Sequence, residues 1–296
     1  VNAIPQRPRL FAESYLIGVA DSAAHGGRWI ISLDDQLAAG LAEKRPDALE
    51  IWRKLTGAAG FFASRRGWSD YVPGAVIGII SDFSGPNEFM TQEILNLVAR
   101  TNMQYRILLK DAVTQSSFVS LRAVLYADEQ PPTPDLRRQV LAFVKEGGML
   151  ITGPKWGGLP GFASTGEEHL RYSLRVLGKG KVAVATPDFE DPYLVANDAV
   201  VLISHRYELL RFWNGGAIGS HFTLNPDGKR AILQLLLYAE ARFGSMTVRV
   251  VGGYHTAKLW TLDQPAPREV VVELQKDAVE LHLPHVSQYA AVELAA

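Results

Sequence analysis

Hydrophobic positions between residues 73 and 206 alternate between continuous apolar runs and stretches with helical spacing. Continuous runs of this length are typical of strands that are covered on both faces. One such run occupies 75–80. Further strands are expected over 105–109, 121–126 and 149–152, and a turn followed by a strand occupies 178–185. Helical spacing is found at 87–101, 134–146 and 191–204. This order predicts an α/β domain of flavodoxin-like type: a parallel sheet with helices on both faces.

The last part of the chain, 207–296, has short apolar runs at regular spacing, with partial alternation of apolar and polar positions. Turn sequences rich in Gly, Asn, Asp and Pro separate these runs. Strands are expected over 209–213, 219–224, 230–238, 246–251, 257–261, 269–274, 279–283 and 289–294. Short strands at even spacing predict an antiparallel β-sandwich.

Residues 1–72 show mainly helical patterns. Helices are expected over 13–24, 36–43 and 46–62, a short apolar run lies at 9–11, and a strand is expected over 28–32. Gly26 and Gly27 end the first helix at a position typical of a C-cap. The pattern predicts a short α/β piece. The expected domains are therefore 1–72, 73–206 and 207–296.

The composition excludes several functions. The chain of 296 residues has no cysteine, so it forms no disulfide, no thiolate metal site and no cysteine nucleophile. Its 30 basic and 31 acidic residues give a formal net charge of −1, without the basic surplus expected of a nucleic-acid-binding protein. No apolar run reaches the length of a membrane span, and no basic-then-apolar leader follows Val1.

Neither a metal nor a cofactor is predicted. The seven histidines, at 25, 169, 205, 221, 255, 282 and 285, are scattered and show no zinc-site spacing. His282 and His285 lie at a strand end, where convergence on one metal ion is not expected. The first strand of the central domain is not followed by a Gly-x-Gly-x-x-Gly sequence, and the chain has no Walker A motif.

Charged residues follow several strands of the predicted sheet, where functional loops of α/β domains lie. Asp82 follows the first strand, Asp128 and Glu129 follow the third, and Lys155 and Trp156 follow the fourth. Their convergence predicts a site for a polar ligand. The alternative interpretation is that these groups cap helices and face solvent.

Three acids near the start of the chain are candidate catalytic groups. Glu13 follows the apolar run at 9–11, and Asp34 and Asp35 follow the predicted strand at 28–32. Carboxylates at strand ends of a barrel supply the acid and the nucleophile of glycosidases. Alternatively, Glu13 stabilises a helix N-terminus and Asp34 is a helix N-cap.

Two segments carry a resemblance to a known family. The sequence ADSAAHGGRW at 20–29 resembles the Ala-His-Gly junction before the last strand of glycoside hydrolase barrels, notably those of the family forty-two β-galactosidases. The sequence PDLRRQVLAFVKEGGMLITG at 134–153 resembles the amidotransferase-like trimerisation domain that follows that barrel. The β-rich tail is similar to the small sandwich that comes next. A complete barrel needs about 250 residues, so at most its last two units precede residue 73.

The resemblance implies a carbohydrate as the ligand class, a homo-oligomer, and a secreted or periplasmic location. It also implies that the central domain lost its amidotransferase activity, because that reaction needs a cysteine. We therefore expect a non-catalytic accessory or assembly region of a carbohydrate-active protein.

Two other functions stay open. The chain is part of a glycoside hydrolase whose barrel is completed before Val1, or it is a glycan-binding or small-molecule-binding module. The module would use Asp82, Asp128 and Trp156 at the sheet edge, or aromatic side chains of the β-rich part: Trp213, Tyr254 and Trp260.

Overall fold

A computed structural model describes residues 11–28, 30–159, 163–164, 166, 169–238, 245–264, 266–284, 286 and 288–296. The chain divides into two compact units. One comprises residues 73–211, and the other combines the described part of 1–72 with 212–296. The predicted boundaries of three domains stay a prediction. No helix in the described ranges is long and apolar enough to cross a membrane.

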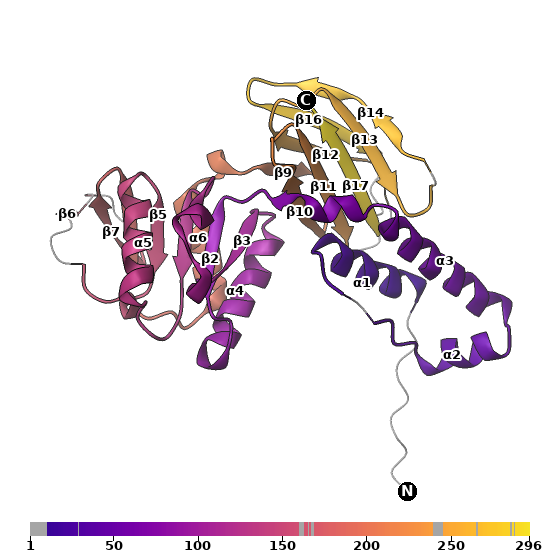
Figure 1. Ribbon diagram of the computed structural model, residues 1–296, viewed down its shortest axis with the longest axis horizontal. Helices are drawn as coiled ribbons and strands as arrows, with labels where there is room; N and C mark the ends of the chain where they lie inside the picture. Colours follow the sequence, from indigo (N-terminus) through magenta and orange to yellow (C-terminus); the bar gives the residue numbers. More distant parts are fainter. Residues whose placement is uncertain are drawn as a thin grey trace, which may run out of the picture. The chain divides into compact units, whose positions relative to one another are not determined.

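The 73–211 unit is built on a mixed sheet of seven strands in the order β3-β2-β4-β5-β8-β7-β6 (Figure 1). Neighbouring pairs from β3 to β8 are parallel, with Ile77 opposite Tyr105 and Ala123, and Ala123 opposite Met149. The strands are β2 (Ile77–Ser81), β3 (Tyr105–Leu109), β4 (Ala123–Tyr126), β5 (Met149–Thr152), β6 (Ala163–Ser164), β7 (Tyr172–Leu177) and β8 (Gly180–Ala185).

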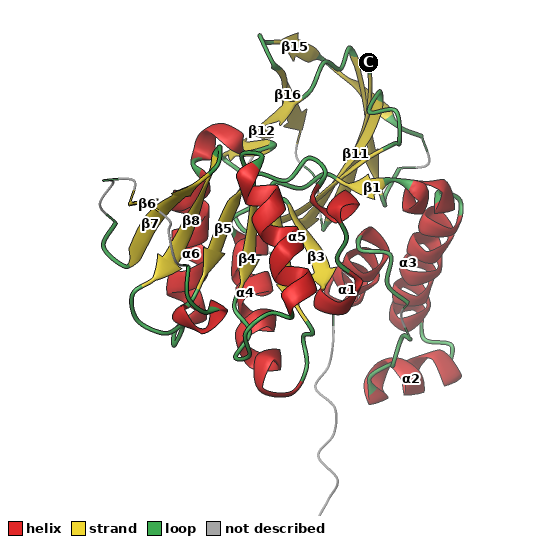
Figure 2. Ribbon diagram, turned by 60° about the vertical axis from the view of Figure 1, so that its left-hand side comes forward, coloured by secondary structure: helices red, strands yellow, loops and turns green. Residues whose placement is uncertain are grey.

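Helices cover both faces of this sheet, as the sequence predicted (Figure 2). Helices α4 (Glu88–Arg100) and α6 (Pro192–Ile203) bury their apolar sides in one core, and α5 (Pro134–Lys145) buries its own in the core on the other face. Side chains of β2 and β4 alternate between the two cores, since successive residues of a strand point to opposite faces.

The sheet is not parallel throughout, which corrects the prediction. Strand β7 pairs antiparallel with β8 and with β6. The turn between β7 and β8 is tight, because Leu177 stands opposite Gly180 and Gly178 adopts a positive φ of 61°. A Cβ atom at Gly178 would lie 2.6 Å from the Lys145 carbonyl oxygen, so both the conformation and the space favour glycine.

The second unit begins with three helices: α1 (Ala12–Ala24), α2 (Asp35–Ala42) and α3 (Pro46–Ala63). The strand predicted over 28–32 is wrong for its described residues, and Ile30 is 96% exposed. The regular secondary structure in the described part of 1–72 is therefore helical, apart from Val72, which begins β1. Residues 9 and 10 of the predicted apolar run at 9–11 lie outside the described residues, and so does Trp29 of the predicted strand.

Two antiparallel sheets complete this unit, in the orders β1-β10-β11-β17-β13-β14 and β15-β16-β12-β9. The strands are β1 (Val72–Pro73), β9 (Leu210–Trp213), β10 (Ile218–Leu224), β11 (Arg230–Leu237), β12 (Ser245–Val251), β13 (Thr256–Thr261), β14 (Arg268–Val270), β15 (Val272–Leu274), β16 (Ala278–Pro284) and β17 (Tyr289–Ala295). Helix α1 contacts β11, and Ala20 and Ala24 are buried with Ile232 and Leu236. The predicted sandwich stays a prediction.

One predicted strand is divided. The run at 269–274 forms β14, which pairs with β13, and β15, which pairs with β16 in the other sheet. Val271 lies at the break and is 75% exposed. An apolar run does not reveal such a change of sheet, since both halves keep strand-like residues.

Short 3₁₀ helices lie at several turns. They are Arg66–Asp70, Gly85–Asn87, Lys110–Ala112, Gln115–Phe118, Pro154–Trp156 and His205–Tyr207.

Candidate functional site

The carboxyl ends of β2, β4 and β5 lie side by side, so the residues that follow them meet at one edge of the sheet. Asp82 and Asp128 both bind the ammonium group of Lys110, which follows β3. The distance from Lys110 Nζ to Asp128 Oδ2 is 3.1 Å. The structure thus brings together two predicted site residues and adds a lysine that the sequence interpretation missed.

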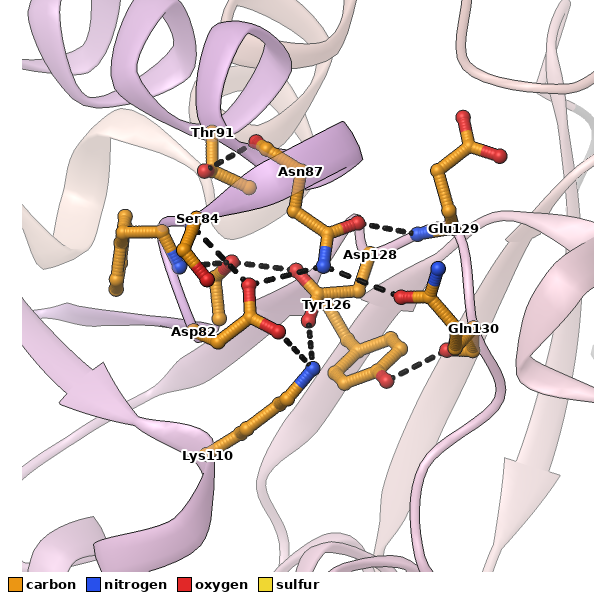
Figure 3. A network of polar contacts seen from close by, with 11 residues as sticks. Asp82, Ser84, Asn87, Thr91, Lys110, Tyr126, Asp128, Glu129 and Gln130 are labelled. Atoms are coloured by element: carbon orange, nitrogen blue, oxygen red, sulfur yellow. Dashed lines mark hydrogen bonds and ion pairs between the residues drawn. The ribbon is translucent and has the colours of Figure 1, made fainter.

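Further hydrogen bonds hold these carboxylates in place (Figure 3). The Ser81 hydroxyl donates to Asp128, and the Asn87 amide donates to Asp82 at 2.9 Å. The Asn87 oxygen in turn accepts from the backbone N–H of Glu129 at 2.8 Å. Asn87 therefore ties the loop after β2 to the loop after β4.

The environment perturbs the charged groups of this network. Hydrogen bonds from Lys110 and then from Asn87 lower the pKa of Asp82 to about 2. Desolvation opposes the charge of Lys110, but hydrogen bonds to Asp82 and Asp128 outweigh it and raise its pKa. Lys110 is consequently a fixed cation and is poorly suited to act as a base or nucleophile.

A second ion-pair cluster lies at the same edge. The ammonium group of Lys155 is 2.6 Å from Glu129 Oε2 and 3.0 Å from Asp188 Oδ2. The hydrogen bond to Glu129, and then the one to Asp188, raise the pKa of Lys155. Asp188 follows β8, so it belongs to the same row of strand ends, although the sequence interpretation did not include it.

A shallow pocket opens at these loops, with a volume of about 340 Å³ that includes its mouth. Trp156 lines it but is only 1% exposed, and its ring meets Tyr126 edge-on at 5.1 Å. Arg137 donates to the Trp156 carbonyl oxygen at 2.6 Å. The indole is therefore a wall of the pocket, with little surface on which a sugar ring could stack.

The three candidate catalytic acids occupy helix starts. Asp34 is buried at the N-cap of α2, where it accepts from the backbone N–H groups of Gln36 and Leu37 at 3.0 and 2.9 Å. The Tyr15 hydroxyl donates to its other oxygen at 2.8 Å. Glu13 and Asp35 are exposed in the first turns of α1 and α2. Their catalytic assignment stays a prediction.

The aromatic side chains proposed for the β-rich part differ in exposure. Tyr254 is buried, whereas Trp213 is 41% exposed. The Arg65 guanidinium lies 4.1 Å from the ring centre of Trp260, whose Nε1 donates to Glu293 at 3.2 Å. Trp260 thus has structural partners on its ring face and on its nitrogen, and Trp213 keeps the most accessible surface of these three.

The missed residues of the sheet edge had a detectable signal. Lys110 directly follows a predicted strand, Asp82 and Asp128 come two residues after theirs, and Asp188 comes three residues after the last predicted strand of the sheet. Asn87 gave no such signal, because its position depends on how the loop after β2 turns into α4.

No known family model matches the sequence, and no curated protein matches it. Several solved structures share the fold. The α-L-fucosidase isoenzyme 2 from Paenibacillus thiaminolyticus matches with a TM-score of 0.61 at 12% identity. The match covers 96% of this chain and 57% of the fucosidase chain. A catalytic mutant of Gan42B, a GH42 β-galactosidase from G. stearothermophilus, has a TM-score of 0.62 at 10% identity, over 97% and 51%. The β-galactosidase from Rahnella sp. R3 has a TM-score of 0.60 at 12% identity, over 100% and 53%.

These matches confirm, at the level of fold, the resemblance to family forty-two β-galactosidases. The chain spans 51% to 57% of the length of these enzymes. Identities this low show a shared architecture and say nothing of the reaction.

Proposed function

We propose that this chain is a non-catalytic accessory or assembly region of a carbohydrate-active protein. One observation carries the proposal. Each titratable side chain that lines the sheet-edge pocket is already paired: Tyr126, Asp128, Glu129, Lys155 and Asp188.

Such pairing opposes acid–base or nucleophilic catalysis at the pocket. A general base must lie within hydrogen-bond reach of the substrate proton, but Asp128 is buried and its two oxygens contact Lys110 and Ser81. The Thr152 hydroxyl donates to the Tyr126 carbonyl oxygen at 3.0 Å. These groups act as cross-links between strand ends, which suits a scaffold.

The likeness to half of each of several glycoside hydrolases favours the carbohydrate-active context and keeps a second function open. In this second function, the chain is part of a glycoside hydrolase whose barrel is completed by sequence before Val1. Glu13 is then the candidate nucleophile. A glycan ligand and a homo-oligomer belong to the proposal as its expected partners.

The test measures hydrolysis of a panel of aryl glycosides by the purified chain, together with its mass by light scattering. We expect no turnover above the buffer rate and a defined oligomer. Hydrolysis that is lost in Glu13→Gln, but kept in the matched first-turn variant Glu88→Gln, would show that the chain itself is an enzyme. A strictly monomeric chain would contradict the assembly role.

A further inference from the structure

Two glutamates face each other across the strands β15 and β16. Glu273 stands directly opposite Glu280 in the antiparallel register, and His282 lies two residues further along β16, on the same face. Like charges in directly opposite positions destabilise a sheet. The arrangement therefore calls for a positive charge between the two carboxylates.

The imidazole of His282 is oriented toward this pair. Its Nδ1 lies 2.9 Å from the Thr247 hydroxyl, on the neighbouring strand β12. Its Nε2 lies 3.3 Å from Glu273 Oε1 and 3.9 Å from Glu280 Oε1. With Nδ1–H donated to Thr247, the Nε2 lone pair and both carboxylates converge on one point.

The other oxygen of Glu280 is also held from outside the cluster. The Gln275 amide donates to Glu280 Oε2 at 2.9 Å, which leaves Oε1 facing His282. One ligand atom from each of Glu273, Glu280 and His282 lies within 4.8 Å of the others. Arg249 stands directly opposite Glu280 on β12 and on the same face of the sheet, so a second positive charge lies beside that carboxylate.

We propose that Glu273, Glu280 and His282 form a binding site for Zn²⁺. One imidazole nitrogen and two carboxylate oxygens match the ligands of zinc, and they leave a fourth tetrahedral position for water because Glu273 and His282 are about half exposed. Calcium and magnesium prefer oxygen ligands alone. Thr247 and Gln275 supply the outer hydrogen bonds that orient zinc ligands. A bound ion would fasten the short strand β15 to β16.

The experiment titrates the chelator-treated full chain with ZnSO₄ by isothermal calorimetry, and with CaCl₂ in parallel. We expect saturable binding of one Zn²⁺ with at least a tenfold preference over Ca²⁺, and a Zn²⁺-dependent rise in melting temperature. His282→Gln should abolish binding, and Thr247→Val should weaken it by about tenfold or more. His255→Gln, which changes another exposed histidine, is the matched control.

Each variant is first checked by its melting temperature without metal, so loss of binding is separated from loss of fold. Equal Zn²⁺ affinity in the wild type and His282→Gln would overturn the proposal. So would Ca²⁺ binding as tight as Zn²⁺ binding, which indicates an acidic surface without zinc selectivity, or no saturable Zn²⁺ binding.

Discussion

Lys110 Nζ lies 3.1 Å from Asp128 Oδ2, and the Asp128 side chain is completely buried. Removal of one partner of such a pair leaves an uncompensated charge in a poorly solvated place. We expect Lys110→Met to lower the free energy of unfolding by about 3 kcal/mol, measured by urea denaturation. Lys155→Met breaks the exposed cluster instead and should leave stability within error. An equal loss in both variants would contradict a structural role specific to Lys110.

Asp82 makes stability depend on acid pH. Its pKa is about 2 in the folded chain and near 3.9 in an unfolded one, so the folded state favours the ionised form. This stabilisation is complete above about pH 4 and is lost as the pH falls toward 2. After screening by solvent we expect it to be about 1 kcal/mol. Asp82→Asn should remove this part of the acid transition, and an unchanged transition would contradict the assignment.

Asp34 is expected to be needed for folding of the N-terminal helices. Asp34→Ala removes the cap of α2 and the acceptor of the Tyr15 hydroxyl, which is buried with it. We expect a loss of about 2 kcal/mol in thermal or urea unfolding. Asp34→Asn keeps an oxygen for the helix N–H groups and should cost less. Asp35→Asn, on the exposed neighbour, is the control and should have little effect.

His221 is expected to stay neutral far below the usual histidine range. Burial, and then the proximity of His25, lowers its pKa to about 4, and the two ring centres are 4.7 Å apart. Its contribution to stability is therefore complete above about pH 6.5 and declines as the pH falls toward 4, by about 3 kcal/mol. NMR titration of the ring protons measures this pKa directly. A midpoint near 6.5 would refute the assignment.

The neighbour His25 should behave in the opposite way. A hydrogen bond with Asp21 raises the pKa of His25 and outweighs its partial desolvation. The stabilisation that the His25–Asp21 pair contributes is thus complete below about pH 6.5, and it is lost as the pH rises through the folded-state pKa of His25. Asp21→Asn should shift the His25 midpoint downward in the same NMR titration, and an unchanged His25 midpoint would contradict the pairing.

The sequence alone predicted most elements of this protein. Helical spacing located α1, α3 and α5, and short segments rich in apolar residues located β3 and β5 at their observed bounds. These signals are local, because a helix or strand buries one face through the spacing of its own residues. The failed strand at 28–32 shows the limit: its apolar residues resemble a strand, but its described residues form no strand in the structure.

Only the tertiary structure decided which distant residues meet. The lateral strand order β3-β2-β4 brings Lys110, Asp82 and Asp128 to neighbouring strand ends, where the lysine binds both carboxylates. The register of β15 on β16 sets Glu273 opposite Glu280, and β12 supplies Thr247 to His282. Strand order and register depend on the packing of the whole core, and no local sequence pattern predicts that packing. The elements were therefore determined by local periodicity, and the sites by long-range pairing.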